Sequence, residues 1–150
     1  MKTFRTLGII AVVLAAIVSV GCKPGGRTSV GEPNDLVIQG TDPVGGTQSA
    51  YLDQSITIQF NQDVDPNTVN SGTIYLLSTN GDVNGTYTVN YSQVIFTPLV
   101  KFQPNTSYTL WVEGWNNNPF CVLSFKGDGL IATQFFTFQT GTQYVPDTDP

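Results

Sequence analysis

Apolar and polar residues alternate most clearly at Ser55–Phe60. Ile56, Ile58 and Phe60 fall on one side of an extended chain, and polar residues fall on the other. A period of two with β-branched residues predicts a strand with one buried face. The polar stretch that follows predicts a turn, in which Asp65 caps a single helical turn that begins at Pro66.

Similar short alternating segments recur along the chain, with Gly, Pro and Asn between them. The dipeptides Asn80-Gly81 and Asn84-Gly85 are strong turn signals. Strand segments separated by such turns predict an all-β fold, an antiparallel sandwich of about seven strands. The other predicted strands are residues 36–39, 73–78, 85–91, 93–98, 107–115 and 134–140, and residues 120–125 can form a further short strand.

The longest predicted strand, 107–115, gives the best candidate binding surface. Its core face is expected to be Tyr108, Leu110 and Val112. The opposite face then carries Trp111, Glu113 and Trp115, and Phe135 lies beside them if the last strand pairs with this one. Exposed aromatics with one carboxylate suit a ligand or a protein partner. The alternative is that the apolar segment 120–125 folds over this face and buries it.

The N-terminus predicts export. Lys2 and Arg5 precede an apolar run, Leu7–Val20, which is short for a membrane span of about 20 residues. The end of this run, Ser19-Val20-Gly21-Cys22, resembles a bacterial lipoprotein signal, although that family usually has Leu where Ser19 stands. The resemblance implies a signal peptide at 1–21 and lipidation of Cys22. Cleavage by the ordinary signal peptidase and an uncleaved anchor are the alternatives.

The chain contains two cysteines, Cys22 and Cys121. If Cys22 carries a lipid, Cys121 has no partner within the chain and is expected to be a buried, inert thiol. A disulfide between the two is the other arrangement, and it would tie the N-terminus to the domain.

Composition divides the chain into a tether, a domain and a tail. Residues 22–35 are rich in Gly and Pro and predict a flexible linker, residues 36–141 predict the sandwich, and residues 142–150 predict a disordered tail. Removal of residues 1–21 leaves four cations against eleven acids, a net charge of −7. This acidity argues against nucleic acid as a partner.

Residue types exclude one large class of catalytic chemistry, although carboxylates that are separated in the sequence could still meet in space. The chain has no histidine, which rules out histidine-based triads and histidine metal ligands, so no enzyme and no cofactor are expected. Asp63 and Asp65 have the spacing that begins a calcium loop. The sixth and twelfth places of such a loop need Gly and Glu, and here they are Thr68 and Ile74. A turn and helix cap is therefore preferred to a metal site.

Seven parts of the ordered region carry a recognisable set of motifs, and they follow one another along the chain: Thr41–Gly46, Ile56–Phe60, Asp63–Val69, Ile95–Pro98, Leu99, Pro104–Tyr108 and Phe138–Gly141. Together, in this order, they resemble the SbsA-type bacterial Ig-like domain. The resemblance implies an Ig-like sandwich that acts as a spacer or interaction module of exported proteins, with no catalytic residues. The chain departs from the family between residues 116 and 129, where it carries an apolar stretch.

These observations predict a cell-envelope lipoprotein with a single Ig-like domain, held to a membrane by its lipid and facing the periplasm or the exterior. Its expected role is structural or adhesive, with an envelope protein or polysaccharide as partner. The alternative is a carbohydrate-binding module that uses a face with Trp111 and Trp115.

Overall fold

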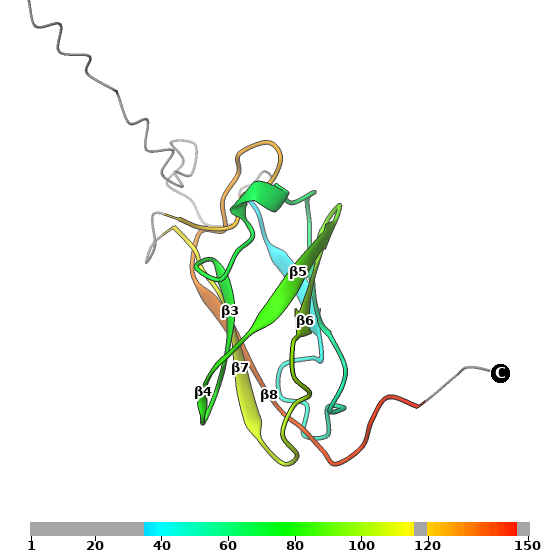
Figure 1. Ribbon diagram of the computed structural model, residues 1–150. Coiled ribbons are helices and arrows are strands. Elements are labelled where there is room, and N and C mark those ends of the chain that lie inside the picture. The colour runs from blue at the N-terminus through cyan, green and yellow to red at the C-terminus, as the bar shows by residue number, and fades with distance from the viewer. Residues whose placement is uncertain (1–34, 116–119, 147–150) are drawn as a thin grey trace, which may run out of the picture.

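The computed structural model describes residues 35–115 and 120–146. They form two four-stranded antiparallel sheets, in the orders β1-β2-β6-β5 and β4-β3-β7-β8 (Figure 1). The predicted antiparallel sandwich is confirmed. It has eight strands because a three-residue strand, β4, follows β3. The elements are β1 (Ile38–Asp42), β2 (Ile56–Phe60), η1 (Pro66–Thr68), β3 (Ile74–Ser78), β4 (Gly81–Val83), β5 (Gly85–Asn90), β6 (Gln93–Pro98), β7 (Ser107–Val112) and β8 (Gln134–Gln139).

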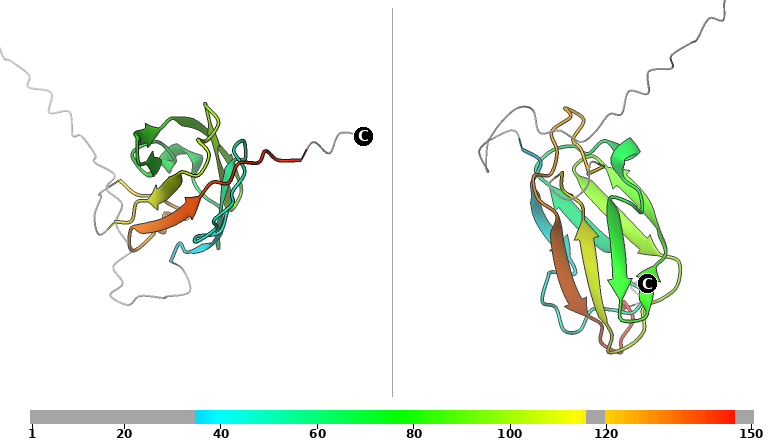
Figure 2. Two further views of the ribbon diagram at one scale, coloured as in Figure 1. Left: turned by 90° about the horizontal axis from the view of Figure 1, so that it is seen from below. Right: turned by 90° about the vertical axis from the view of Figure 1, so that its left-hand side faces the viewer.

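The two sheets bury the apolar positions of their alternating strands. In the first sheet, Ile56 lies opposite Phe96 and Ile58 opposite Val94 across the β2–β6 pair, and all four side chains are buried. In the second sheet, β7 pairs with β3 and β8, so these three strands lie side by side (Figure 2). The inner face of β7 is Tyr108, Leu110 and Val112, as the alternation predicts.

The two Asn-Gly dipeptides have different roles. Asn80-Gly81 lies in the tight β3–β4 hairpin, where Gly81 has a φ of +113° that favours glycine. At Asn84-Gly85 the chain instead crosses from one sheet to the other. A Cβ on Gly85 would lie 2.3 Å from a ring carbon of Phe96, so the crossing requires a residue without a side chain.

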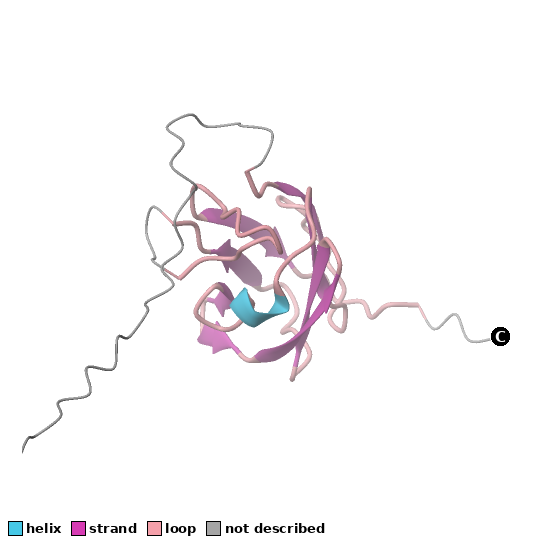
Figure 3. Ribbon diagram, turned by 90° about the horizontal axis from the view of Figure 1, so that it is seen from above, coloured by secondary structure: helices cyan, strands magenta, loops and turns pink. Residues whose placement is uncertain are grey.

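Residues 120–130 close one end of the sandwich. Ser124 bridges to Val64, and the amides of Asp65 and Phe125 donate to the carbonyls of Leu123 and Asp63. These bonds hold the segment against the turn that contains η1, at the end shown from above in Figure 3. Residues 120–125 thus form isolated bridges here and no regular strand.

The opposite end of the sandwich carries the C-terminal segment. Residues 142–146, which belong to the predicted tail, lie against the domain: Leu52 donates its amide to Gln143, and Val145 donates its amide to the Asp53 carboxylate. The Lys101 ammonium lies 4.4 Å from the ring centroid of Tyr144. The predicted signal peptide and all of the linker before Asp35 lie outside the described residues. Within the described ranges, no helix has the length and apolarity needed to cross a membrane.

Candidate binding face

An aromatic side chain from each of three neighbouring strands lies in one row on the outer face of the second sheet. Tyr75 of β3 pairs with Trp111 of β7, and Trp111 pairs with Phe135 of β8. These three residues are called the aromatic row. They face outward because their neighbours in the alternation point to the core: Ile74, Leu76, Leu110 and Val112 are buried, and Phe136 is partly buried against them.

The rings of the aromatic row are in contact. The Tyr75 and Trp111 centroids are 6.2 Å apart with an interplanar angle of 9°, and those of Trp111 and Phe135 are 5.1 Å apart at 34°. Such cross-strand aromatic pairs stabilise a sheet. Burial falls across the row: Tyr75 and Trp111 are partly buried, whereas Phe135 is 62% exposed. The row therefore keeps apolar surface in water at its β8 side.

Glu113 holds one side of the aromatic row in place. The Tyr75 hydroxyl donates to Oε1 of Glu113 at 2.7 Å, and the Thr133 hydroxyl donates to Oε2 at 2.8 Å. Thr133 Oγ1 in turn accepts the Gly114 amide at 3.0 Å. Both carboxylate oxygens are engaged, so this network fixes the Tyr75 ring and the segment that precedes β8.

Burial and the Glu113 carboxylate together raise the pKa of Tyr75 to about 12, because desolvation, the hydrogen bond and the negative charge all disfavour the phenolate. Tyr75 is thus a neutral hydrogen-bond donor throughout the physiological range.

The structure brings together Trp111, Glu113 and Phe135, three of the four residues expected on this face. Trp115 lies beyond the end of β7, where its amide donates to the Leu130 carbonyl. Among the described residues, the ring contacts of Trp111 are with Tyr75 and Phe135. Trp115 is 41% exposed but is not part of the row. Residues 123–125 are hydrogen-bonded to the turn at Asp63–Thr68, and Phe135 on the candidate face remains 62% exposed.

Tyr75 was not among the residues expected on this face, although its position carried a signal. It lies between Ile74 and Leu76, which are both buried, so alternation alone turns it outward. Its contact with Trp111 depends on the pairing of strands that are more than thirty residues apart in the sequence, and local patterns do not specify such pairing.

The other sequence-derived candidates have structural roles. The Asp65 carboxylate accepts the Asn67 amide at 3.0 Å and caps η1, with Pro66 in the first position, as predicted. Asp63 uses its backbone carbonyl to bind Phe125. The described part of the chain contains no group of three or more metal-ligating side chains. Cys121 is buried, as expected, but the expectation of a free thiol was wrong: its sulfur is disulfide-bonded, and the partner lies outside the described residues.

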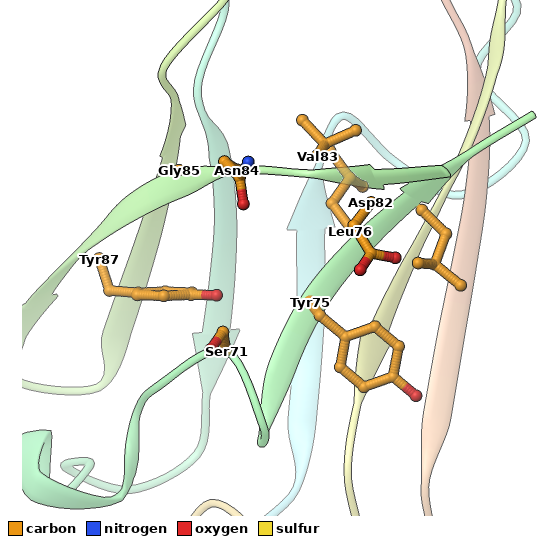
Figure 4. Close-up of a pocket in the computed structure, with 9 residues that line it drawn as sticks. Ser71, Tyr75, Leu76, Asp82, Val83, Asn84, Gly85 and Tyr87 are labelled. Carbon is orange, nitrogen blue, oxygen red and sulfur yellow. The ribbon is translucent and has the colours of Figure 1, made fainter. Parts of the chain in front are cut away.

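A separate groove of about 560 Å³ opens where the two sheets diverge (Figure 4). Leu76, Val83 and Gly85 line it, with Tyr75 at one side. The Tyr87 hydroxyl donates to the Ile74 carbonyl at 2.6 Å and so links the two sheets, and burial raises the pKa of Tyr87. Asp82 is the one carboxylate among the lining residues. Apolar and polar side chains therefore both line the groove.

Several solved structures share this fold. The N-terminal part of the bacterial S-layer protein SbsC aligns with a TM-score of 0.52 at 13% identity over 71% of this chain, and the chain spans 24% of that structure's length. CopC from Methylosinus trichosporium OB3b aligns with a TM-score of 0.54 at 14% identity, over 74% of this chain and 98% of CopC. The native conformation of E. coli alpha-2-macroglobulin aligns with a TM-score of 0.54 at 11% identity, over 73% of this chain and 6% of that one. At these identities the similarity shows the fold alone.

A search of curated protein sequences found no match. The family model for the bacterial Ig-like domain, in contrast, matches residues 32–140, which include all eight strands. The two-sheet architecture and the match across the whole sandwich agree, and the chain therefore belongs to the bacterial Ig-like domain family.

Proposed function

We propose that this protein is a cell-envelope lipoprotein whose Ig-like domain is a non-catalytic interaction module, and that it docks an envelope protein on the aromatic row. The observation that carries the proposal is the row itself: three aromatic side chains in register on an outer sheet face, with Phe135 still 62% exposed. Aromatic residues are enriched at the centres of protein interfaces, where rigid rings contribute contact area at low entropic cost.

The hydrogen bonds of Glu113 favour a protein partner. Its two oxygens already accept from Tyr75 and Thr133, so the polar groups nearest the aromatic row are engaged within the domain. Next to the row, the hydroxyls of Thr109 and Thr137 are bonded to each other at 3.0 Å. A partner that buries the rings then leaves few polar groups unsatisfied, which is the requirement for a stable interface.

Carbohydrate binding is the second candidate. It is supported by the same combination of indole, phenyl and carboxylate groups, since sugar rings stack on aromatics and their hydroxyls bind carboxylates. In this candidate Trp111 and Phe135, whose rings are 5.1 Å apart, would provide the stacking surface, whereas Trp115 lies outside the row.

The face is tested with the mature protein and three variants. Trp111→Ala and Phe135→Ser are expected to weaken capture of a cross-linked envelope partner at least about fivefold, because hot-spot aromatics each contribute more than about 1 kcal/mol. Leu99→Ser is the matched control: Leu99 lies outside the aromatic row, and its apolar side chain has an exposure (68%) similar to that of Phe135. Equal loss in all three variants, or in none, contradicts the proposal. Saturable change of tryptophan emission with an envelope polysaccharide, abolished by Trp111→Phe, favours the second candidate.

The lipid anchor is a separate part of the proposal. Its support is the resemblance of residues 1–22 to a lipoprotein signal and the small residue before Cys22. Cys121 is disulfide-bonded, and Cys22 is the one other cysteine in the chain. The sulfur of Cys22 cannot carry a lipid thioether while it is part of a disulfide. Lipidation thus requires that Cys121 be released from an intramolecular bridge or be paired with another molecule.

Mass spectrometry of the protein isolated from bacterial membranes decides between these states. The proposal predicts an N-terminal Cys22 peptide that carries a diacylglyceryl group, and predicts that Cys22→Ser releases the protein from the membrane fraction. Cys121→Ser is the control and is expected to leave the protein in that fraction. A peptide in which Cys22 is linked to Cys121 would contradict the anchor.

A further inference from the structure

Four exposed aromatic residues gather at the end of the sandwich where the described chain begins. They are Tyr91, Trp115, Phe120 and Phe125, with exposures of 76%, 41%, 67% and 69%, and together they are called the aromatic end. We propose that the aromatic end rests on the surface of a zwitterionic bilayer, so that the membrane is a second contact of this domain. The proposal rests on the lipid anchor proposed above.

Backbone contacts place these residues at one end. The Phe125 amide donates to the Asp63 carbonyl, and the next residue, Val64, donates its amide to the Tyr91 carbonyl. On the other side, Trp115 donates its amide to Leu130, and Leu130 bridges to Leu36 at the start of the described chain. Figure 1 shows this end, with η1 and residues 120–130, opposite the end that carries the C-terminal segment.

The residue types suit the interface between headgroups and acyl chains. Trp and Tyr are enriched there because each has an apolar body and a polar group that stays hydrated, and Phe adds apolar area. The fold itself does not require these side chains to be exposed. Residues 121, 122 and 124 of the same segment are buried, so the segment already packs through other positions while it presents Phe120 and Phe125.

The position of the anchor converts weak contact into stable docking. Twelve residues separate Cys22 from Asp35, and a connection of that length reaches at most about 45 Å even when fully extended. An anchored domain therefore remains within that distance of the bilayer, where its effective concentration is of about millimolar order. Under that condition a few inserted aromatic side chains are sufficient to keep the anchored domain docked on the bilayer. The same side chains would not recruit a domain that lacks the anchor.

Charge selects the kind of bilayer. Four carboxylates lie at this end, on Asp35, Asp63, Asp65 and Asp128, and Lys126 is the one cation of the 120–130 segment. Anionic headgroups would be repelled by this excess of negative charge, and the repulsion is strongest within a Debye length of about 8–10 Å. Neutral zwitterionic lipid is therefore the expected surface.

Bromine-labelled lipids test the contact, because bromine quenches indole emission only at short range. The protein, residues 22–150, is held on phosphatidylcholine vesicles through an N-terminal hexahistidine tag and a nickel-chelating lipid; the chain has no histidine of its own. Two variants each retain one indole: Trp111→Phe reports Trp115, and Trp115→Phe reports Trp111. On brominated relative to ordinary vesicles, Trp115 emission is expected to fall at least about twofold, with little change for Trp111 on the flank of the domain.

Two further comparisons sharpen the test. Phe120→Ser combined with Phe125→Ser should remove most of the Trp115 quenching, whereas Leu99→Ser with Val100→Ser, two exposed residues at the opposite end, should not. Replacement of about a third of the lipid by phosphatidylglycerol should reduce the quenching. Absence of Trp115 quenching, or equal quenching of both indoles, overturns the proposal. The tag replaces the natural anchor, so this result is independent of the mass measurement that tests lipidation.

Discussion

Two aromatic clusters lie on opposite faces of the sheet that contains β7 and β8. The inner cluster is Phe102, Tyr108 and Phe138, with ring centroids 4.6 to 5.8 Å apart, and all three rings are buried. The outer cluster is the aromatic row, with similar ring separations of 5.1 and 6.2 Å. Ring contact is therefore nearly the same on the two faces, and the difference lies in the access of solvent.

The two clusters also satisfy their hydroxyl groups differently. The inner Tyr108 oxygen accepts the backbone amide of Gln103 at 2.8 Å, a bond that fixes the β6–β7 connection. The outer Tyr75 donates to the Glu113 carboxylate. A neutral backbone bond suits the dry core, whereas a charged acceptor is tolerated only where it keeps part of its hydration. The inner cluster thus stabilises the fold, and the outer cluster retains surface for a partner.

The largest expected effect comes from truncation of one ring on each face of β8. Phe138→Ala should lower the free energy of unfolding by about 3–5 kcal/mol, because it removes a buried ring and leaves a cavity. Phe135→Ala should lower it by less than about 1 kcal/mol, because that ring is mostly exposed. Urea unfolding of the two variants measures both values, and comparable losses would show that the outer row is a second core.

Gly114 provides a test of the outer network through the backbone. A Cβ at this position would lie 2.2 Å from the Ala132 carbonyl carbon, so Gly114→Ala should displace the segment that carries Thr133 and should cost about 1–3 kcal/mol. Gly40→Ala is the control, since no atom lies within 4 Å of the place that its added methyl group would occupy. Thermal unfolding should separate the two variants, and equal stability would contradict the close approach.

Glu113→Gln should have a smaller effect, about 1 kcal/mol, because the amide carbonyl still accepts one hydroxyl while the other hydrogen bond is weakened. The same change removes the negative charge that disfavours the Tyr75 phenolate, so the pKa of Tyr75 should fall from about 12 towards its ordinary value of 10.0. Ultraviolet titration of phenolate absorbance, with Tyr75→Phe to identify the transition, measures the shift. An unchanged transition would assign the raised pKa to burial alone.

The last expected effect appears only at high pH. Because folding raises the pKa of Tyr75, the folded state holds this proton more tightly than the unfolded state, and the resulting stability is complete below pH 10 and is lost as pH rises from 10 to about 12. Tyr75→Phe should therefore show a shallower loss of stability across that window than the unmodified protein. Urea midpoints at about pH 9 and about pH 11.5, on either side of the start of that window, measure it, and parallel curves would contradict the linkage.

Local alternation correctly predicted which face of a strand is buried and which faces solvent. The spacing of Ile56, Ile58 and Phe60 placed β2 in the core, and the same period turned Trp111 and Phe135 outward. The turn at Asp65-Pro66 was also predicted, since a cap depends on neighbours only two residues away. The failures occur where a strand ends. Extension of the alternation to Trp115 was wrong, because β7 stops at Val112.

Features that depend on composition or on near neighbours could be predicted from the order of the amino acids: the strands, their buried faces, the turn residues and the acidity. Tertiary structure alone decided which outward residues meet. Tyr75 joins Trp111 only through the β3–β7 pairing, and residues 120–130 lie on the η1 turn because their backbone bonds go to Asp63–Thr68. Contacts between distant segments depend on how the strands pair and how the sheets pack. The alternation within a single strand does not identify the strand with which it pairs.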